Sequence, residues 1–324
     1  MEDVARAAGV SMITVSRALN TPDKLAPATL ARVRTAIERL RYVPNLTAGS
    51  LASNRSRIVA AIVPTIANSI FSDTIDGLAQ TLAQHRYQLL LGQTQYRLDE
   101  EAALVDAFLG RRVDGIVLTG IAHARGVRGR LQRAGIPVVE TWDLTPTPID
   151  MLVGFSHRAI AEAVCRRFFE AGRRRLAVIG ADDARAQRRS AAFVAAACSL
   201  GLAEPAVQLV PAPTTLGSGR SALAALLRTC PDVDAVFCSS DLLALGALTE
   251  CQALRIEVPK RFSLIGFGDL DFARDLHPAL TSVRIDGSRI GREAAHCVVE
   301  RAEGRSVPEH IIDVGFAIVG RATD

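Results

Sequence analysis

The sequence has no run of apolar residues long enough to cross a membrane. A transmembrane helix needs about 20 mostly apolar residues, and no apolar stretch of this 324-residue chain approaches that length. The N-terminus, MEDVARAAGV, is acidic and polar, whereas a secretory signal begins with basic residues and continues with an apolar segment. We therefore expect a cytoplasmic protein without a membrane partner.

The sequence is also poor in the patterns that build metal centres and disulfide frameworks. Its six cysteines include no CxxC pair, and its six histidines form no set with the spacing of metal ligands. We therefore expect no metal and no cofactor. Each cysteine lies in an apolar stretch, so we expect all of them to be reduced and buried in the core: Cys165, Cys198, Cys230, Cys238, Cys251 and Cys297.

Catalytic signatures are missing as well. The sequence contains no GxSxG, HExxH, P-loop or GxGxxG motif, so no motif supports an enzyme. Hydrophobic residues make up 49% of the chain and charged residues 22%, which is enough apolar material for the cores of two or three globular domains.

Positive charge is concentrated near the N-terminus. Residues 1–57 hold nine Lys and Arg against four Asp and Glu, whereas the other 267 residues hold 29 basic and 30 acidic side chains. A basic segment on a nearly neutral body is typical of a protein that binds a polyanion such as DNA, because each neutralised phosphate releases condensed counterions. A solvated charged face explains the charge alone equally well.

The basic segment has the pattern of a helix-turn-helix. Residues 3–8 and 12–20 favour two short helices, Gly9 permits the positive φ of a tight turn, and Ser11 is a plausible N-cap of the second helix. A third helix over residues 28–40 follows Pro27. The expected shared core consists of apolar side chains from all three helices: Val4, Ala5, Val10, Val15, Leu19, Leu30, Val33, Ile37 and Leu40.

The second helix offers side chains suited to the major groove. Met12 and Ile13 are expected to contact thymine methyl groups or groove walls, with ordinary packing as the alternative. Arg17 is expected to carry most of the sequence preference, by pairing with guanine or by contacting a phosphate. The other expected contacts of this helix are Ser11, Thr14, Ser16 and Asn20.

The runs DVARAAGVSMITVSRALN and RVRTAIERLRYVPNLTAGSLASNRS resemble the N-terminal segment of the lactose-repressor (LacI) family of bacterial transcription regulators, and the likeness continues to the end of the chain. The family pattern Tyr-x-Pro-Asn is matched at Tyr42, Pro44 and Asn45. The resemblance implies that Tyr42 and Asn45 contact DNA and that Leu51 is the hinge leucine that wedges into the minor groove of a palindromic operator. About eight hinge residues, 46–53, are too few for an isolated helix, so the hinge is expected to fold only on DNA and against its dimer mate.

The rest of the chain alternates apolar runs with amphipathic segments, the pattern of a parallel sheet covered by helices. Two such cycles indicate two α/β lobes, and the fold class is therefore a helical head with a periplasmic-binding-protein-like body of two doubly wound sheets. The expected strands are IVAAIVP, YQLLLGQ, GIVLTG, PVVETWD, RLAVIGA, VQLVPA, AVFCSS and FSLIGFGD, and the expected helices cover residues 71–85, 98–111, 125–134, 157–171, 184–200, 218–229, 241–254 and 290–303. We place the head at 1–44, the hinge and linker at 45–57, lobe 1 at 58–155 and 286–314, and lobe 2 at 156–285 and 315–324.

Ligands of open α/β sheets bind at the carboxyl ends of the strands. That rule selects residues 65–71, 119, 140–143, 181–183, 239–241 and 266–271. Together with the family resemblance, in which Arg189 holds sugar oxygens, it predicts these effector contacts: Asn68, Phe71, Thr119, Glu140, Trp142, Arg189, Ser240, Asp241 and Asp269. Trp142 stacks on a sugar or packs between the lobes, and charged residues of such clefts also serve lobe closure.

Three strings, PVVETWDLTPTPIDMLVGF, FCSSDLLALGA and IGFGDLDF, are similar to the gluconate-type repressors of the family. Gly268 stands where many members have an Asp, and the loss of a carboxylate beside a retained Arg189 fits an anionic effector. The resemblance implies a homodimeric repressor of sugar-acid genes that releases or tightens on DNA when gluconate or a related acid binds. The alternatives are a sugar-acid enzyme with an added DNA-binding domain and a transport receptor, which would need an export signal.

Overall fold

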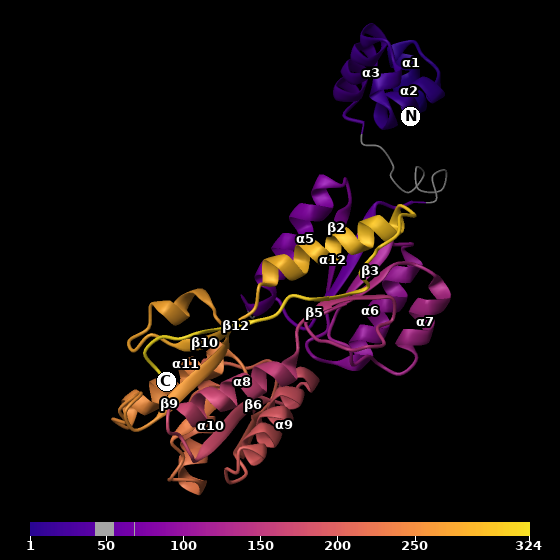
Figure 1. Cartoon of the computed structure of the whole chain (residues 1–324). Helices are drawn as coiled ribbons and strands as arrows, with labels where there is room; N and C mark the ends of the chain where they lie inside the picture. The colour runs from indigo at the N-terminus through magenta and orange to yellow at the C-terminus, as the bar shows by residue number, and fades with distance from the viewer. Residues whose placement is uncertain (43–54, 68) are drawn as a thin grey trace. The chain divides into compact units, whose positions relative to one another are not determined.

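The computed structural model describes residues 1–42, 55–67 and 69–324 (Figure 1). The chain forms two compact units, Met1–Ser56 and Arg57–Asp324. Five predicted features lie wholly or partly outside the described residues: the hinge over residues 46–53 with Leu51, the motif residues Pro44 and Asn45, and the effector contact Asn68.

The N-terminal unit is a small three-helix bundle. Its helices are α1 (Glu2–Ala8), α2 (Met12–Asn20) and α3 (Pro27–Leu40), with a 3-10 turn at Pro22–Lys24. Gly9 ends α1 with φ 62°, and Ser11 caps α2 by accepting a hydrogen bond from the backbone N–H of Thr14. The buried core comprises Val4, Ala5, Ala8, Val15, Val33 and Ala36. The helix-turn-helix expected from the sequence is therefore present.

One expected core residue of the bundle is wrong. Leu40 is 41% exposed, because α3 ends there and Arg41 turns into the left-handed region with φ 47°. The chain reverses, and Tyr42 packs against the bundle instead. Tyr42, an expected DNA contact, is thus partly buried against the core.

The second unit contains two six-stranded sheets within the described residues. The first has the order β11-β5-β4-β3-β1-β2 and is parallel throughout. Its strands are β1 (Ile58–Val63), β2 (Gln88–Gln93), β3 (Gly115–Thr119), β4 (Val138–Thr141), β5 (Met151–Gly154) and β11 (Ile311–Asp313). Helices α5 (Ser72–Gln84), α6 (Leu98–Gly110), α7 (Val127–Ala134) and α12 (Gly287–Ala302) accompany it, and we call this assembly the first lobe.

The second sheet has the order β12-β10-β9-β8-β6-β7 and is parallel except that β12 runs antiparallel to β10. Its strands are β6 (Leu176–Ala181), β7 (Ala206–Val210), β8 (Ala235–Cys238), β9 (Ser263–Gly268), β10 (Thr281–Arg284) and β12 (Ala317–Val319). Helices α8 (His157–Glu170), α9 (Ala184–Ser199), α10 (Leu216–Thr229) and α11 (Asp241–Ala253) belong to it. We call this assembly the second lobe, and the predicted fold class is confirmed.

Helix α12 follows a strand of the second sheet but packs on the first lobe, alongside α5 (Figure 1). Glycines allow this close approach. A β-carbon on Gly291 would lie 2.2 Å from the carbonyl oxygen of Thr74, and one on Gly77 would lie 2.6 Å from that of Ser288. The chain therefore crosses between the lobes more than once, and α5 and α12 meet without side chains between them.

Two smaller expectations were tested by the fold. The four short strands β5, β10, β11 and β12 were missed by the sequence analysis, since each has only three or four residues. Cys165, Cys238, Cys251 and Cys297 are buried and free, as expected, whereas the expectation is wrong for Cys198, which is exposed, and Cys230 is only partly buried. Cys198 lies in the last turn of α9, on its solvent side. None of the helices in the described part of the chain has the length and apolarity of a membrane span.

Candidate functional site

The first turn of α2 presents apolar side chains to solvent. Met12 is 55% and Ile13 66% exposed, so neither belongs to the small core of the bundle. The hydroxyls of Ser11 and Thr14 lie 3.0 Å apart at the same end of the helix, and Arg17 is exposed one turn later. Burying two large apolar groups is favourable, so this turn is suited to a partner surface that carries both apolar and polar edges. Ser16 is half-buried, and Asn20 ends the helix.

In the second unit, four of the predicted effector contacts meet around one small cavity. Phe71, Trp142, Arg189 and Ser240 come from four different segments and line a cavity of about 40 Å³. Phe71 and Trp142 belong to the first lobe, Arg189 and Ser240 to the second, so the cavity lies between the lobes. The remaining lining residues are Ile70, Tyr96, His157, Ala181, Asp183, Arg185, Thr214, Ser239 and Phe267.

Arg189 is the dominant charge of this cavity. Its side chain projects from α9, is 5% exposed, and lies with its guanidinium carbon 3.9 Å from the centre of the Phe267 ring. One terminal nitrogen donates to Nδ1 of His157 at 3.1 Å, and the other donates to the carbonyl of Ser239 at 3.0 Å. Among the described residues the Nε–H has no acceptor although it is buried. Burial lowers the pKa of Arg189 to about 10, so the group is still cationic at neutral pH.

His157 orients Arg189 without neutralising it. Its Nε2 lies 3.0 Å from the carbonyl oxygen of Trp142, to which it must donate, and its Nδ1 therefore accepts from Arg189. Burial, and the positive charge of Arg189, hold the pKa of His157 well below its usual range. The imidazole is thus neutral, and the cavity keeps the full charge of the guanidinium.

Trp142 forms the aromatic wall of the cavity. Its indole N–H donates to Oγ1 of Thr74 on α5 at 3.1 Å, and its ring meets those of Phe71 and Phe155 edge to face at 5.0 and 5.6 Å. It has φ 65°, which a bulky residue rarely adopts. Backbone strain of this kind persists where the surrounding contacts demand it and is concentrated at binding sites. Trp142 therefore both packs the first lobe and lines the cavity.

A second, larger cavity of about 270 Å³ adjoins the first and shares three lining residues with it, Tyr96, Asp183 and Arg185. The Arg185 guanidinium lies 5.2 Å from the Phe71 ring and 3.6 Å from the Asp183 carboxylate, and among the described residues its buried Nη1 has no hydrogen-bond acceptor. The larger cavity is further lined by Ile62, Val63, Pro64, Thr94, Arg97, Leu98, Glu101, Thr119, Gly120, Ile121, Ala122, Asp143, Asp182, Ala184 and Arg188. Arg188 of the second lobe bonds Asp143 of the first at 2.5 Å, across the same space.

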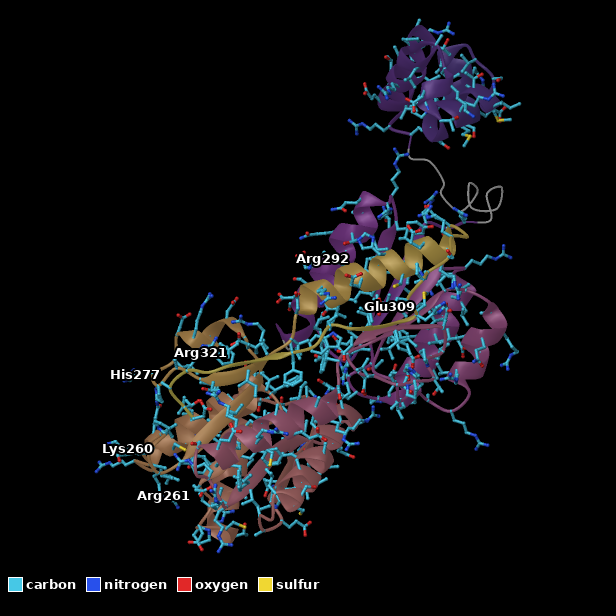
Figure 2. All side chains as sticks on the ribbon, viewed as in Figure 1. Lys260, Arg261, His277, Arg292, Glu309 and Arg321 are labelled. Carbon is cyan, nitrogen blue, oxygen red and sulfur yellow. The ribbon has the colours of Figure 1, made fainter. Side chains whose placement is uncertain are left out.

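Three predicted effector contacts line neither cavity. Asp241 accepts from the hydroxyl of Ser282 at 2.6 Å and from the backbone N–H of Leu270 at 2.7 Å, and burial raises its pKa to about 6. Asp269 pairs with Arg284 and with Arg321 at 2.6 Å each, the latter labelled in Figure 2. Both carboxylates thus hold the end of the second sheet together.

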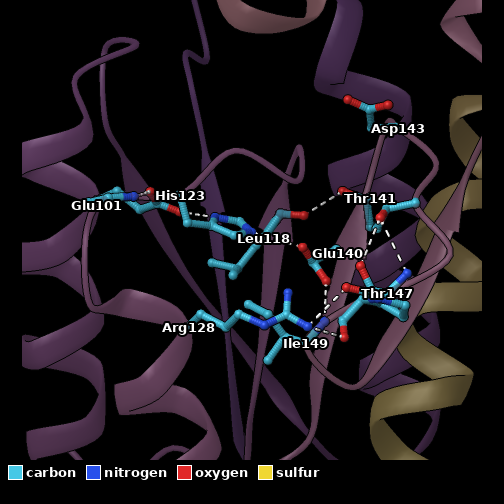
Figure 3. Close-up of polar contacts among 12 residues, drawn as sticks. Glu101, Leu118, His123, Arg128, Glu140, Thr141, Asp143, Thr147 and Ile149 are labelled. Atoms are coloured by element: carbon cyan, nitrogen blue, oxygen red, sulfur yellow. Dashed lines mark hydrogen bonds and ion pairs between the residues drawn. The ribbon is translucent and has the colours of Figure 1, made fainter.

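Glu140 is the third such residue, and it belongs to a buried cluster in the first lobe (Figure 3). Its two oxygens accept from Nε2 of His123 at 3.0 Å and from the backbone N–H of Ile149 at 2.5 Å. Nδ1 of His123 lies 2.6 Å from Glu101, whose other oxygen accepts from the backbone N–H of Ala124. Burial alone would lower the pKa of His123, but the hydrogen bonds to Glu101 and Glu140 raise it to about 9. Thr119, predicted with this group, donates to the carbonyl of Ile62 and lines the larger cavity.

The sequence analysis missed Tyr96, His157, Arg185 and Thr214. Tyr96 lies three residues beyond the end of β2, a strand that was expected, so the strand-end rule itself predicts it. His157 comes after β5, which was not expected, and no signal was available for it. Arg185 precedes Arg189 by one helical turn on α9, and that spacing places both on one face of the helix.

Comparison with known proteins gives consistent matches over the whole chain. The family model of the bacterial regulatory proteins of the lacI family matches residues 1–45, and that of the periplasmic binding protein-like domain matches residues 165–323. The transcriptional regulator GntR of Pseudomonas aeruginosa is 35% identical over 99% of this chain and 94% of its own length, and the regulator IdnR of Escherichia coli is 31% identical over 98% and 96%. The crystal structure of a LacI-family transcriptional regulator from Silicibacter pomeroyi is 33% identical, covers 99% of this chain and 98% of its own, and superposes with a TM-score of 0.92.

Proposed function

This chain belongs to the lactose-repressor (LacI) family of bacterial regulatory proteins, and from that premise we propose that it represses sugar-acid genes under the control of an acid bound at Arg189. It is a DNA-binding transcriptional regulator with an effector-binding domain, and not an enzyme. The family binds operator DNA and a small-molecule effector. What the following paragraphs argue is the chemistry of that effector and the residues that bind it.

The proposal rests on the unsatisfied Nε–H of Arg189. A buried cationic donor without an acceptor is costly, and a carboxylate is the partner that repays this cost best. The neighbouring imidazole of His157 is neutral and does not do so. Gluconate, a related aldonate or a keto-aldonate supplies such a carboxylate together with hydroxyls for Ser240 and Thr214, whose own hydroxyls lie 3.2 Å apart beside the cavity.

Two further observations favour an acid over a neutral sugar. Gly268 has no carboxylate, and an Asp there would stand near Asp241, whose Oδ2 lies 3.7 Å from the place of the missing β-carbon. The GntR and IdnR regulators are similar to this chain over nearly their whole length, in line with the resemblance of its sequence to gluconate-type repressors.

On the DNA side, we propose that two chains form a homodimer on a palindromic operator, in the cytoplasm where such DNA lies. The exposed Met12, Ile13 and Arg17 of α2 would enter the major groove of each half-site, with Ser11, Thr14, Ser16 and Asn20 beside them. Tyr42, Asn45 and the hinge residue Leu51 complete the proposed interface.

Effector control then requires that the acid prefer one arrangement of the lobes. Its carboxylate would contact the second lobe at Arg189, while its other atoms face Phe71 and Trp142 of the first. The differential affinity sets the size of the response, typically about 1–3 kcal/mol in operator affinity.

The test is a calorimetric titration of the full-length protein with gluconate, 2-ketogluconate and glucose. We expect saturable binding of at least one acid, no binding of glucose, and loss of acid binding in Arg189→Met. Tighter binding of glucose than of either acid, or undiminished acid binding in the variant, would contradict the proposal.

A further inference from the structure

The cavity at Arg189 is too small for a whole sugar acid. A volume of about 40 Å³ admits about three water-sized groups, which is the size of a single carboxylate. The rest of a six-carbon acid therefore has to lie elsewhere. The adjoining cavity of about 270 Å³ is close to the lower limit of ordinary ligand sites, about 300 Å³, and is not used by any interaction described above.

Two side chains from opposite lobes stand between the cavities. Arg185 projects from α9 and its guanidinium lies against Phe71 of the first lobe, while its Cδ is 3.8 Å from where a β-carbon on Gly120 would be. Tyr96 lies on the loop between β2 and α6, where Gln95 and Tyr96 have φ of 52° and 64°. Two successive non-glycine residues in the left-handed region cost free energy, and such strain is retained where it places a side chain for binding.

The chemistry at the junction of the cavities suits an oxygen-rich chain. Nη1 of Arg185 is a buried donor without an acceptor among the described residues, and it complements an oxygen on the carbon next to a carboxylate. Burial raises the pKa of Tyr96, so its hydroxyl remains a donor. Beyond the junction, the larger cavity offers the carboxylates of Asp182 and Asp183 to hydroxyl groups and a floor of apolar side chains that includes Ile62 and Ile121.

We propose that the two cavities form one effector compartment and that it takes an open-chain sugar acid. The carboxylate binds Arg189, the adjacent hydroxyl or keto oxygen binds Arg185, and the polyhydroxyl tail passes Tyr96 into the larger cavity. A pyranose ring is too wide for the passage that Arg185 and Tyr96 leave between the cavities. This inference depends on the proposed function, because it assumes an acid at Arg189.

The first arm of the test compares three acids on the full-length protein by calorimetry. Gluconate is an open six-carbon chain, glucuronate carries its carboxylate on a ring, and glycerate is too short to reach the larger cavity. We expect gluconate to bind at least about tenfold more tightly than either of the others, equivalent to about 1.4 kcal/mol. Tighter binding of glucuronate than of gluconate would overturn the open-chain assignment.

The second arm fills the larger cavity. Ala184 is exposed at the first position of α9 and lines only that cavity, so Ala184→Trp should fold normally and block the tail. Ala191, exposed on the same helix and outside the lining of both cavities, provides the matched control Ala191→Trp. We expect Ala184→Trp to weaken gluconate by about tenfold or more while glycerate changes by less than about twofold, and Ala191→Trp to change neither.

The outcomes separate the two proposals. Unchanged gluconate affinity in Ala184→Trp, or equal weakening of both acids, would overturn the single compartment and leave Arg189 as the acid site. Failure of every acid to bind the unmodified protein would instead overturn the proposed function, and the compartment with it.

Discussion

The body contains two buried charged centres that solve the same electrostatic problem in opposite ways. In the cluster of Glu101, His123 and Glu140, each of the four carboxylate oxygens accepts a hydrogen bond and a protonated imidazole lies between the two acids. At Arg189 the charge is equally buried, but its Nε–H has no acceptor among the described residues and its nearest titratable neighbour is neutral. Complete pairing is the mark of a structural centre, and a missing partner is the mark of a centre that awaits a ligand.

The largest expected effect follows from breaking the paired centre. His123→Ala leaves Glu101 and Glu140 buried without a cation, which should lower the free energy of unfolding by about 3–5 kcal/mol. Urea unfolding followed by circular dichroism measures this. A loss below about 1 kcal/mol would show that the cluster is not the structural centre that its geometry indicates.

Arg189→Met should have the opposite signature. Replacing a buried, incompletely paired cation by an apolar side chain of similar length is expected to leave the unliganded protein as stable or up to about 2 kcal/mol more stable, while acid binding is lost. The same urea experiment, with and without gluconate, measures both. If the variant is strongly destabilised without ligand, Arg189 is structural and the contrast between the centres disappears.

The pH dependence of stability sharpens the comparison further. The pKa of His123 is raised to about 9 from 6.5, so its contribution to stability is fully present below pH 6.5 and is lost as the pH rises through 9. His157 has a lowered pKa, and protonation of the unfolded chain therefore destabilises the fold as the pH falls below 6.5. Melting temperatures from pH 5 to 10 should fall at both ends, and His123→Gln should remove the alkaline fall only. An unchanged alkaline limb in that variant would show that another group causes it.

Arg185→Gln should have the smallest effect of the four. The Arg185 side chain is 12% exposed and already lies near Asp183, so it contributes one contact to an acid that Arg189 still binds. We expect gluconate affinity to fall by about tenfold, with stability unchanged. A complete loss of binding, as large as that in Arg189→Met, would make Arg185 the main anchor and would reverse the ranking of the two arginines.

Much of the fold was accessible from local patterns. Gly9 and Ser11 mark the turn and the N-cap of the reading helix through backbone requirements that only a few residue types meet. The long strands and amphipathic helices of the body follow from their periodicity. The strands β11 and β12 escaped because three residues carry too little periodicity, and only pairing with a neighbouring strand defines them.

The site was predictable only where a residue's neighbours along the chain carry the information. Phe71 and Trp142 lie at strand ends or in the loops that follow, and they line the cavity as expected. Glu140 occupies the same kind of position, but His123, 17 residues earlier, and the backbone of Ile149 turn it into a structural group. The partner of a buried carboxylate is a tertiary property, and the strand-end rule does not include it.

The most direct test of the account is operator binding as a function of acid concentration. Fluorescence anisotropy of a labelled operator duplex, selected by this protein from genomic fragments, should show that gluconate or a related acid shifts the affinity of the unmodified protein by about 5- to 150-fold. It should show no shift for Arg189→Met, whose affinity without acid remains normal. Identical operator affinity at every acid concentration, or the same shift in the variant, would contradict the claim that an acid at Arg189 controls the DNA-binding unit.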